Sequence, residues 1–301
     1  MSLARVFLEN LLPVMLLAGV GWLVRRRIGI DPKPLAQIVF YVLSPALIFN
    51  LLVEIPVALG DMLRMAGFVT LLLAILATVA WLTARALRLS RTLTSALILT
   101  VTFMNAGNLG LPITQLALGQ VPLAWATVFF STTALLSNSV GAWVAGVGRA
   151  TPARALAGLA RVPAVFAIPL ALALRAAGFS LPPLAAVPIG LLAGAAIPSM
   201  LLLLGMQLAG VGRPASVGLL AASGALRLVA SPLIAWLVSP IFALPPAAFQ
   251  AGLLESAMPS AVLNSILATQ YDVEPEFVSG AVLFSTMLSM FTLSPLLLMF
   301  Q

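Results

Sequence analysis

The sequence predicts an all-α polytopic membrane protein of ten transmembrane helices, arranged as two inverted five-helix repeats. Hydrophobic residues make up 62% of the 301-residue chain and charged residues only 8%, whereas soluble domains carry about 25% charged residues. The mean hydropathy is +1.15, and the apolar residues form runs long enough to cross a bilayer as helices. Landmark residues of the first half recur in the second half, which indicates an internal repeat.

The apolar runs lack the strict alternation of barrel strands, so they favour helices. The ten predicted spans are Val6–Val24, Leu35–Val53, Met65–Ala84, Leu93–Leu118, Leu123–Val147, Val162–Ala177, Leu184–Leu208, Ala215–Leu237, Ala247–Ala268 and Phe277–Phe300. The sixth span is short and contains Pro163 and Pro169. The basic cluster Arg25–Arg27 follows the first span instead of preceding it, which indicates a retained helix and not a signal peptide.

Basic residues gather on one side of the predicted membrane. That side holds Arg25, Arg26, Arg27, Lys33, Arg85, Arg88, Arg91, Arg149, Arg154, Arg161 and Arg213. The opposite side holds only Arg5, Arg64 and Arg175. The positive-inside rule then places both termini outside the cytoplasm. Because these cations lie at the ends of apolar runs, the net charge of +7 gives no reason to expect nucleic acid as a partner; the lipid bilayer is the expected one.

The missing residue types exclude several kinds of chemistry. The chain has no cysteine and no histidine, so disulfides, thiol catalysis and the commonest zinc ligand are absent. Lys33, the only lysine, lies in a loop, and no pair of acids lies in adjacent spans for an aspartyl protease. We therefore expect a protein that is not an enzyme and has no catalytic residue, no cofactor and no metal other than a coupled sodium ion.

Three landmarks recur between the halves. They are Pro45 and Pro198, 153 residues apart, Pro112 and Pro259, 147 apart, and the Phe-Ser-Thr runs 130–132 and 284–286, 154 apart. Two repeats of five spans each must have opposite orientations in the membrane, because five is odd. We divide the chain at 1–150 and 151–301, with the boundary in the connection Gly148–Arg161. Inverted repeats of this kind are typical of secondary transporters.

The fourth span is interrupted by polar and helix-breaking residues, in Asn105–Ile113. Pro112 removes a backbone donor, and Gly110 permits close approach of the chain. A broken helix inside a membrane must be buried in protein or line a wet cavity, where its free N–H groups attract an anion. Asn105 and Asn108 add uncharged donors. A kinked helix whose asparagines bond neighbouring helices is the alternative.

The ninth span carries a matching interruption, in Leu254–Asn264. If spans four and nine cross there, Ser260 and Asn264 meet the asparagines of the fourth span beside Pro259. Glu255 is the one acid well inside a span of the second half. A carboxylate at that depth indicates a function by default, and two remain open for it: binding of a cation such as sodium, or uptake and release of a proton.

Four other polar positions and one cation complete the candidate site. Ser131 and Thr132 are candidate cation ligands in the fifth span, although such hydroxyls often bond their own helix. Asn50 and Gln207 are candidate lining residues from the second and seventh spans. Arg227, in the eighth span, either pairs with Glu255 or supplies positive potential for an anionic substrate.

At these residues the chain resembles the auxin efflux carrier family, which includes plant auxin carriers and bacterial carriers of malate, malonate and similar acids. The resemblance rests on Ser44–Leu52, on Asn105–Ile113, on the stretch from Glu255 to Ser294, and especially on Tyr271–Glu276 followed by Ala281–Phe284. Glu255 is distantly similar to the acidic residue of the bile acid–sodium symporters, which implies coupling to sodium or protons.

The resemblance implies crossed, broken helices four and nine in a transport part made of helices 3–5 and 8–10. A scaffold of helices 1, 2, 6 and 7 completes the fold. It also implies a substrate role for Asn105, with Pro112 and Pro259 at the crossing. A bacterial inner (plasma) membrane is the implied location, and a homodimer is compatible with it.

The predicted function is secondary active transport of a small organic anion, a mono- or dicarboxylate or an auxin-like acid, by alternating access. The substrate is expected at the crossing of helices four and nine. A cation–proton antiporter of related inverted-repeat fold and a solute-sensing membrane receptor are the alternatives. The antiporter is disfavoured because the fourth span carries no acid.

Overall fold

The regular elements of the protein are helices throughout the part of the chain that the structure describes. This computed structural model describes residue 5 and residues 7–55, 57–146, 163–179, 181–210 and 217–300. In these ranges one isolated backbone bridge joins Met104 and Ser260. The predicted boundary at Gly148–Arg161, with Arg213 and the span ends Val6, Val147, Val162 and Ala215, lies outside the described residues.

The first half of the chain begins with a helix and runs through several π-helical turns. Its α-helices are α2 (Leu12–Leu23), α3 (Pro32–Ile38), α4 (Ser44–Glu54), α5 (Leu59–Ala86), α6 (Arg91–Thr102), α7 (Leu111–Leu118), α8 (Gln120–Leu136) and α9 (Ala142–Ala145). The π-helical turns are η1 (Phe7–Leu11), η2 (Val24–Ile28), η3 (Val39–Leu43), η4 (Ala106–Gly110) and η5 (Ser137–Gly141). The turns continue neighbouring helices, so several spans consist of two or three of these elements.

The second half is also helical, with one π-helical turn, η6 (Leu226–Ala230), and one 3-10 turn, η7 (Ser239–Phe242). Its α-helices are α11 (Ala164–Ala176), α12 (Pro183–Leu208), α13 (Val217–Ala225), α14 (Ser231–Val238), α15 (Pro246–Ser256), α16 (Val262–Tyr271) and α17 (Pro275–Leu298).

Seven continuous helices of the described residues are long and apolar enough to cross a membrane. They are Phe7–Ile28, Pro32–Glu54, Leu59–Ala86, Gln120–Ala145, Pro183–Leu208, Val217–Phe242 and Pro275–Leu298. Each overlaps one predicted span, and α5 is longer than the prediction because it begins at Leu59 and includes the polar residues Asp61 and Arg64 before Met65. The other three predicted spans coincide with the short helix α11 and with the interrupted pairs α6–α7 and α15–α16.

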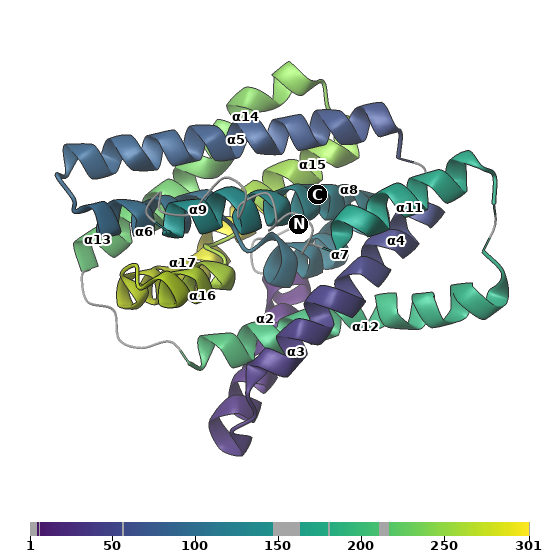
Figure 1. Ribbon diagram of the computed structural model, residues 1–301, viewed down its shortest axis with the longest axis horizontal. Helices are drawn as coiled ribbons and strands as arrows, with labels where there is room; N and C mark the ends of the chain where they lie inside the picture. The colour runs from purple at the N-terminus through teal and green to yellow at the C-terminus, as the bar shows by residue number, and fades with distance from the viewer. Residues whose placement is uncertain are drawn as a thin grey trace.

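The helices pack as two groups. Helix α12 packs along α2 and α4, and α4 packs in turn against α11. In the other group α5 packs on α6 and α8, α8 packs on α15, and α17 packs on α13 and α16. Figure 1 shows the crossing of α12 with α2 and α3 below the layer that contains α5. The interrupted helices belong to the second group, and their π-helical turn η4 touches α12 of the first.

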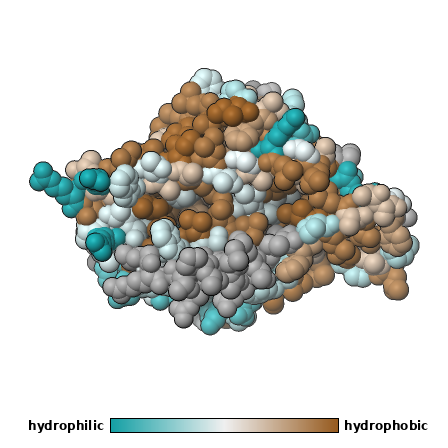
Figure 2. All heavy atoms as spheres, turned by 45° about the horizontal axis from the view of Figure 1, so that its top comes forward, coloured by the Kyte–Doolittle hydropathy of each residue, from teal (hydrophilic) through white to brown (hydrophobic). Residues whose placement is uncertain are grey.

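Large apolar side chains cover much of the outer surface. Leu184 is 90% exposed, Phe291 78% and Leu191 72%, and broad brown areas mark this kind of surface in Figure 2. A soluble protein rarely exposes patches of this extent. The outward-facing side chains therefore suit lipid contact, and the chain is a multi-pass membrane protein.

Glycines bring the backbones of α2 and α12 close together. A Cβ atom at Gly205 would overlap the carbonyl oxygen of Ala18, and one at Gly21 would overlap the carbonyl oxygen of Leu202. Small residues permit such close approach where helices associate inside a membrane. The contact therefore leaves no room for a side chain at Gly21 or Gly205.

We expect Gly205→Ala to destabilise the protein by roughly 1–3 kcal/mol, because the added methyl group meets backbone that cannot move aside. Gly194→Ala in the same helix is the matched control, since a Cβ there has nothing within 4 Å. Thermal melts of both variants in detergent check the prediction. Equal melting temperatures for the two variants would contradict it.

Candidate functional site

The first interruption separates α6 from α7. Helix α6 ends at Thr102, Phe103 is extended (φ −99°, ψ 108°), and the chain becomes helical again at Ala106. Pro112 lies where η4 continues into α7, and because it has no N–H it cannot donate the helical hydrogen bond of its position. The fourth span is interrupted as predicted, but at Phe103, Met104 and Asn105 and not along the whole of Asn105–Ile113, because the chain is helical again from Ala106.

The second interruption separates α15 from α16 and has the same form. Helix α15 ends at Ser256, and α16 begins at Val262 after Ala261, which is extended (φ −69°, ψ 140°). Pro259 lies between them and cannot donate a hydrogen bond. All residues from Ala251 to Ser260 are buried, so the freed backbone groups need partners inside the protein.

Backbone groups of the two interruptions form hydrogen bonds with each other. The backbone N–H of Asn105 donates to the carbonyl of Pro259 at 2.7 Å, and the N–H of Ala261 donates to the carbonyl of Phe103 at 2.9 Å. The side-chain amide of Asn264 donates to the same Phe103 carbonyl at 2.9 Å and to the Ser260 hydroxyl at 3.0 Å. These bonds remove the cost of unpaired backbone groups inside a membrane and hold the two chains side by side.

Arg227 binds the ends of both helices that lead into the interruptions. It is fully buried, and its guanidinium donates to the carbonyls of Val101 at 2.6 Å and Thr102 at 3.3 Å. The same group donates to the carbonyl of Ser256 and to the hydroxyl of Ser231. The last carbonyls of a helix lack partners and carry its negative dipole end. One cation therefore caps α6 and α15 together.

Arg227 does not form the ion pair with Glu255 that is one of the two roles left open for it, since the ion pairs of the described residues are Arg5–Glu9 and Arg64–Asp61. Arg227 reaches the carbonyl of Ser256, the neighbour of Glu255. Successive side chains of a helix point about 100° apart, which carries the Glu255 side chain to another face of α15.

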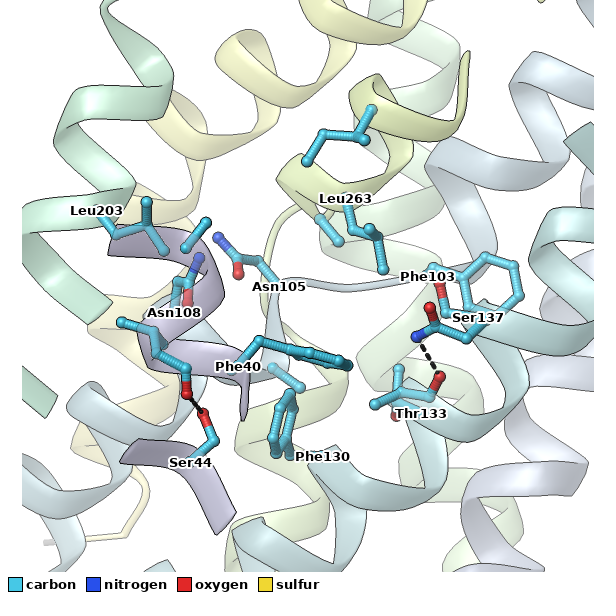
Figure 3. A pocket seen from close by; sticks show the side chains of 18 of the residues that line it. Phe40, Ser44, Phe103, Asn105, Asn108, Phe130, Thr133, Ser137, Leu203 and Leu263 are labelled. Atoms are coloured by element: carbon cyan, nitrogen blue, oxygen red, sulfur yellow. Dashed lines mark hydrogen bonds between the residues drawn. The ribbon is translucent and has the colours of Figure 1, made fainter. Parts of the chain in front are cut away.

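A cavity of about 410 Å³ lies against the first interruption. Its polar lining residues are Lys33, Gln37, Ser44, Asn105, Asn108, Thr133, Ser137, Asn138 and Gln207, and its larger apolar ones include Phe40, Tyr41, Phe103, Phe130, Leu203, Leu263 and Ile266. Figure 3 shows Asn105 and Asn108 on the Leu203 side of this cavity and Thr133 and Ser137 on the other side, with Phe40 and Phe130 between them. Its walls come from both helix groups.

Asn105 and Asn108 present amide groups to this cavity. Asn105 is 5% exposed, and its Nδ2 has no hydrogen-bond partner among the described residues. Asn108 is half-buried, and its Nδ2 donates to Oε1 of Gln207 on α12 at 3.3 Å. A buried donor without a partner is costly, so the Asn105 amide is a group that a ligand in the cavity would satisfy.

Glu255 lies outside the cavity lining, beside the start of α7. The Thr114 hydroxyl donates to its Oε1 at 3.3 Å, and Oε2 is buried without a partner among the described residues. A Cβ atom at Gly110 would overlap this carboxylate. Residue 110 must therefore be glycine for Glu255 to lie against the backbone where η4 continues into α7. The sequence offers the acid, but only the structure reveals Thr114 and Gly110 as its neighbours.

Most of the other predicted site residues do not line the cavity. Ser131 and Thr132 donate to the carbonyls of Thr127 and Val128 in their own helix. Pro112, Pro259, Ser260 and Asn264 are buried at or beside the interruptions and do not line the cavity. Asn50, which is half-buried in α4, does not line the cavity either. Gln207 does line the cavity.

Sequence reasoning did not select Lys33, Gln37, Phe40, Phe130 and Leu203 for the site. The structure brings them together with Asn105 around one cavity. Their types are ordinary for a loop or an apolar helix, so no local signal distinguishes them.

Comparison with known proteins identifies relatives along the whole chain. The family described as "Membrane transport protein" matches residues 6–156 and 149–297. A curated protein of Methanothermobacter thermautotrophicus, named an uncharacterized transporter, is 29% identical over 290 residues. That alignment covers 95% of each chain.

We expect Arg227→Met to destabilise the protein on the order of 3 kcal/mol, because buried carbonyls of two helices lose a charged donor. Arg64→Met is the control: Arg64 pairs with Asp61 at the surface, where such pairs contribute about 0–1 kcal/mol. Denaturant or thermal unfolding in detergent measures both. If Arg227→Met lowered the stability no more than Arg64→Met does, the capping role of Arg227 would be refuted.

Proposed function

The chain belongs to the membrane transport protein family, the family of the auxin efflux carriers, and from this premise we propose that it is a secondary active carrier of small organic anions. The observation that carries the proposal is the buried amide of Asn105, which faces a cavity and has no partner among the described residues. An amide N–H donor is suited to a carboxylate oxygen. The substrate would be a mono- or dicarboxylate or an auxin-like acid.

The cavity lining favours an anion over a cation. No Asp or Glu is among its described lining residues, whereas Asn, Gln, Ser and Thr side chains and Lys33 are. The first N–H groups of η4, which begins next to Asn105, add the positive end of a helix. Apolar and aromatic walls would accommodate the carbon skeleton of the acid.

We propose that the fold is an inverted repeat of two five-helix units, 1–150 and 151–301. Two arginine contacts support this relation. Arg25 follows the first span and donates to the carbonyl of Met206 at the end of the seventh, at 3.0 Å. Arg175, at the end of the sixth span, donates to the carbonyl of Leu52 near the end of the second, at 3.2 Å. In the proposed repeat the first span corresponds to the sixth and the second to the seventh. The contact from span one to span seven therefore corresponds to the contact from span six to span two.

Alternating access follows from this arrangement. The scaffold would consist of spans 1, 2, 6 and 7, and the moving part of spans 3–5 and 8–10, with spans four and nine crossing at their interruptions. The cavity is lined by Phe40 and Leu203 from the scaffold and by Asn105 and Phe130 from the moving part. A substrate held there would pass across the membrane as one part slides against the other.

We place the carrier in the bacterial inner membrane with both termini outside the cytoplasm, on the asymmetry of basic residues between its connections. A homodimer is compatible with the broad apolar surface of Figure 2.

Purified protein in proteoliposomes is expected to take up at least one of malate, malonate and auxin, and Asn105→Ala is expected to lower the rate at least tenfold. A lost charge-assisted hydrogen bond of about 1.5–3 kcal/mol corresponds to that change. Uptake of radiolabelled acid measures both. Asn50→Ala is the control, because Asn50 is an asparagine of α4 outside the cavity lining.

No uptake of any acid under sodium or proton gradients would contradict the carrier proposal. Sodium–proton exchange without organic acid would favour the antiporter instead. Full activity of a folded Asn105→Ala protein would remove Asn105 from the site.

We propose that Glu255 couples transport to sodium or protons. Its carboxylate is fully buried with a single hydroxyl donor, that of Thr114, and an anion so poorly compensated suits a bound cation or proton. Glu255→Gln is expected to abolish accumulation driven by an ion gradient while exchange of labelled for unlabelled acid continues. Glu276→Gln, at an exposed acid, serves as control, and gradient-driven accumulation by Glu255→Gln at the wild-type level would exclude the coupling role.

A further inference from the structure

The cavity carries one cation at its exposed edge. Lys33 lies in the first turn of α3, where its backbone N–H donates to the Asp31 carboxylate at 3.1 Å and the helix start is thereby fixed. Its side chain lines the cavity and is exposed. No carboxylate of the described residues forms an ion pair with it, since the pairs present there are Arg5–Glu9 and Arg64–Asp61.

Polar side chains lead from Lys33 towards the interruption. Gln37 follows one turn later in α3 and is exposed, Asn138 and Asn108 are half-buried, and Asn105 is buried at 5% exposure. All of them line the same cavity. The cavity therefore offers an anion a cation at its exposed edge and neutral donors at increasing depth.

The exposed edge lies on the side of the basic connections. Lys33 follows Arg25–Arg27 in the connection between the first two spans, the side that the proposed topology assigns to the cytoplasm. Glu255 and Thr114 lie beside the start of α7, outside this cavity lining. The cavity and the coupling acid thus occupy different places around the interruptions.

We propose that Lys33 is the entry residue for anions on the cytoplasmic side, and that this structure is the state open to that side. This inference rests on the proposed carrier function and adds a recognition residue to it. A positive group at the edge of a low-dielectric cavity raises the local concentration of anions and their rate of entry. Since the proposed topology assigns the connection that holds Lys33 to the cytoplasmic side, the effect of Lys33 is expected on that side only.

The test uses everted and right-side-out vesicles that contain the carrier, with radiolabelled malate, malonate or auxin. For Lys33→Gln we expect the apparent KM at the cytoplasmic face to rise about threefold to tenfold, and less at high salt. The KM at the opposite face is expected to stay at the wild-type value. Arg26→Gln is the control, because Arg26 is exposed in the same connection and lies over the Trp22 ring at 5.6 Å, away from the cavity lining.

A charge-restoration experiment separates electrostatics from folding. The chain contains no cysteine, so Lys33→Cys introduces a single thiol that a methanethiosulfonate reagent can modify. A trimethylammonium reagent is expected to restore the wild-type KM, and a sulfonate reagent of similar size is expected to raise it further.

Equal effects of the two reagents would overturn the proposal, as would an unchanged KM in Lys33→Gln or an equal rise at both faces. These results differ from failure of the carrier function itself, in which the wild-type protein moves no acid.

Discussion

The fold depends on the backbone polar groups that two interrupted helices leave unpaired inside a membrane. Each unpaired N–H or carbonyl there costs several kcal/mol. The protein meets this cost locally: Asn105 and Ala261 donate across to the other interruption, and Arg227 caps the helices that lead into both. The two halves of the chain must come together for either interruption to be tolerated, so pairing of the halves and formation of the site are one event.

This constraint also sets the electrostatics of the site. A buried arginine faces the carbonyl ends of α6 and α15, whose negative dipole ends attract it. The acid Glu255 lies against Gly110, where η4 continues into α7. Neither charge lines the cavity, whose described lining consists of neutral amides, hydroxyls and apolar side chains with one exposed cation, Lys33. An arrangement of this kind separates the charges that hold the fold from the groups that would bind an anion.

The sequence was sufficient for the helical class and for the two interruptions, because both depend on local composition. Proline, glycine and asparagine in an apolar run mark a broken helix wherever the run packs, so the stretch around Asn105 could be located. Whether Arg227 pairs with Glu255 could not be decided from the sequence, because proximity of spans does not give the direction of side chains around a helix. Lys33 was interpreted only as a loop cation. A lysine that orients a span in the membrane and a lysine that attracts an anionic ligand cannot be told apart in sequence. Which residues share a cavity depends on how distant helices pack, and no local pattern contains that.

The rigid and the adjustable contacts of the molecule lie in different places. Between α2 and α12 the glycines Gly21 and Gly205 bring backbone against backbone, which leaves no room for sliding. Around the cavity, the polar link between α12 and η4 is the Asn108–Gln207 bond at 3.3 Å, which water or a carboxylate can replace at small cost. Motion is therefore expected where the cavity separates the two helix groups and not within either group. A ligand that binds Asn108 would compete with Gln207 for the same amide, so binding itself would loosen this polar contact between the two helix groups.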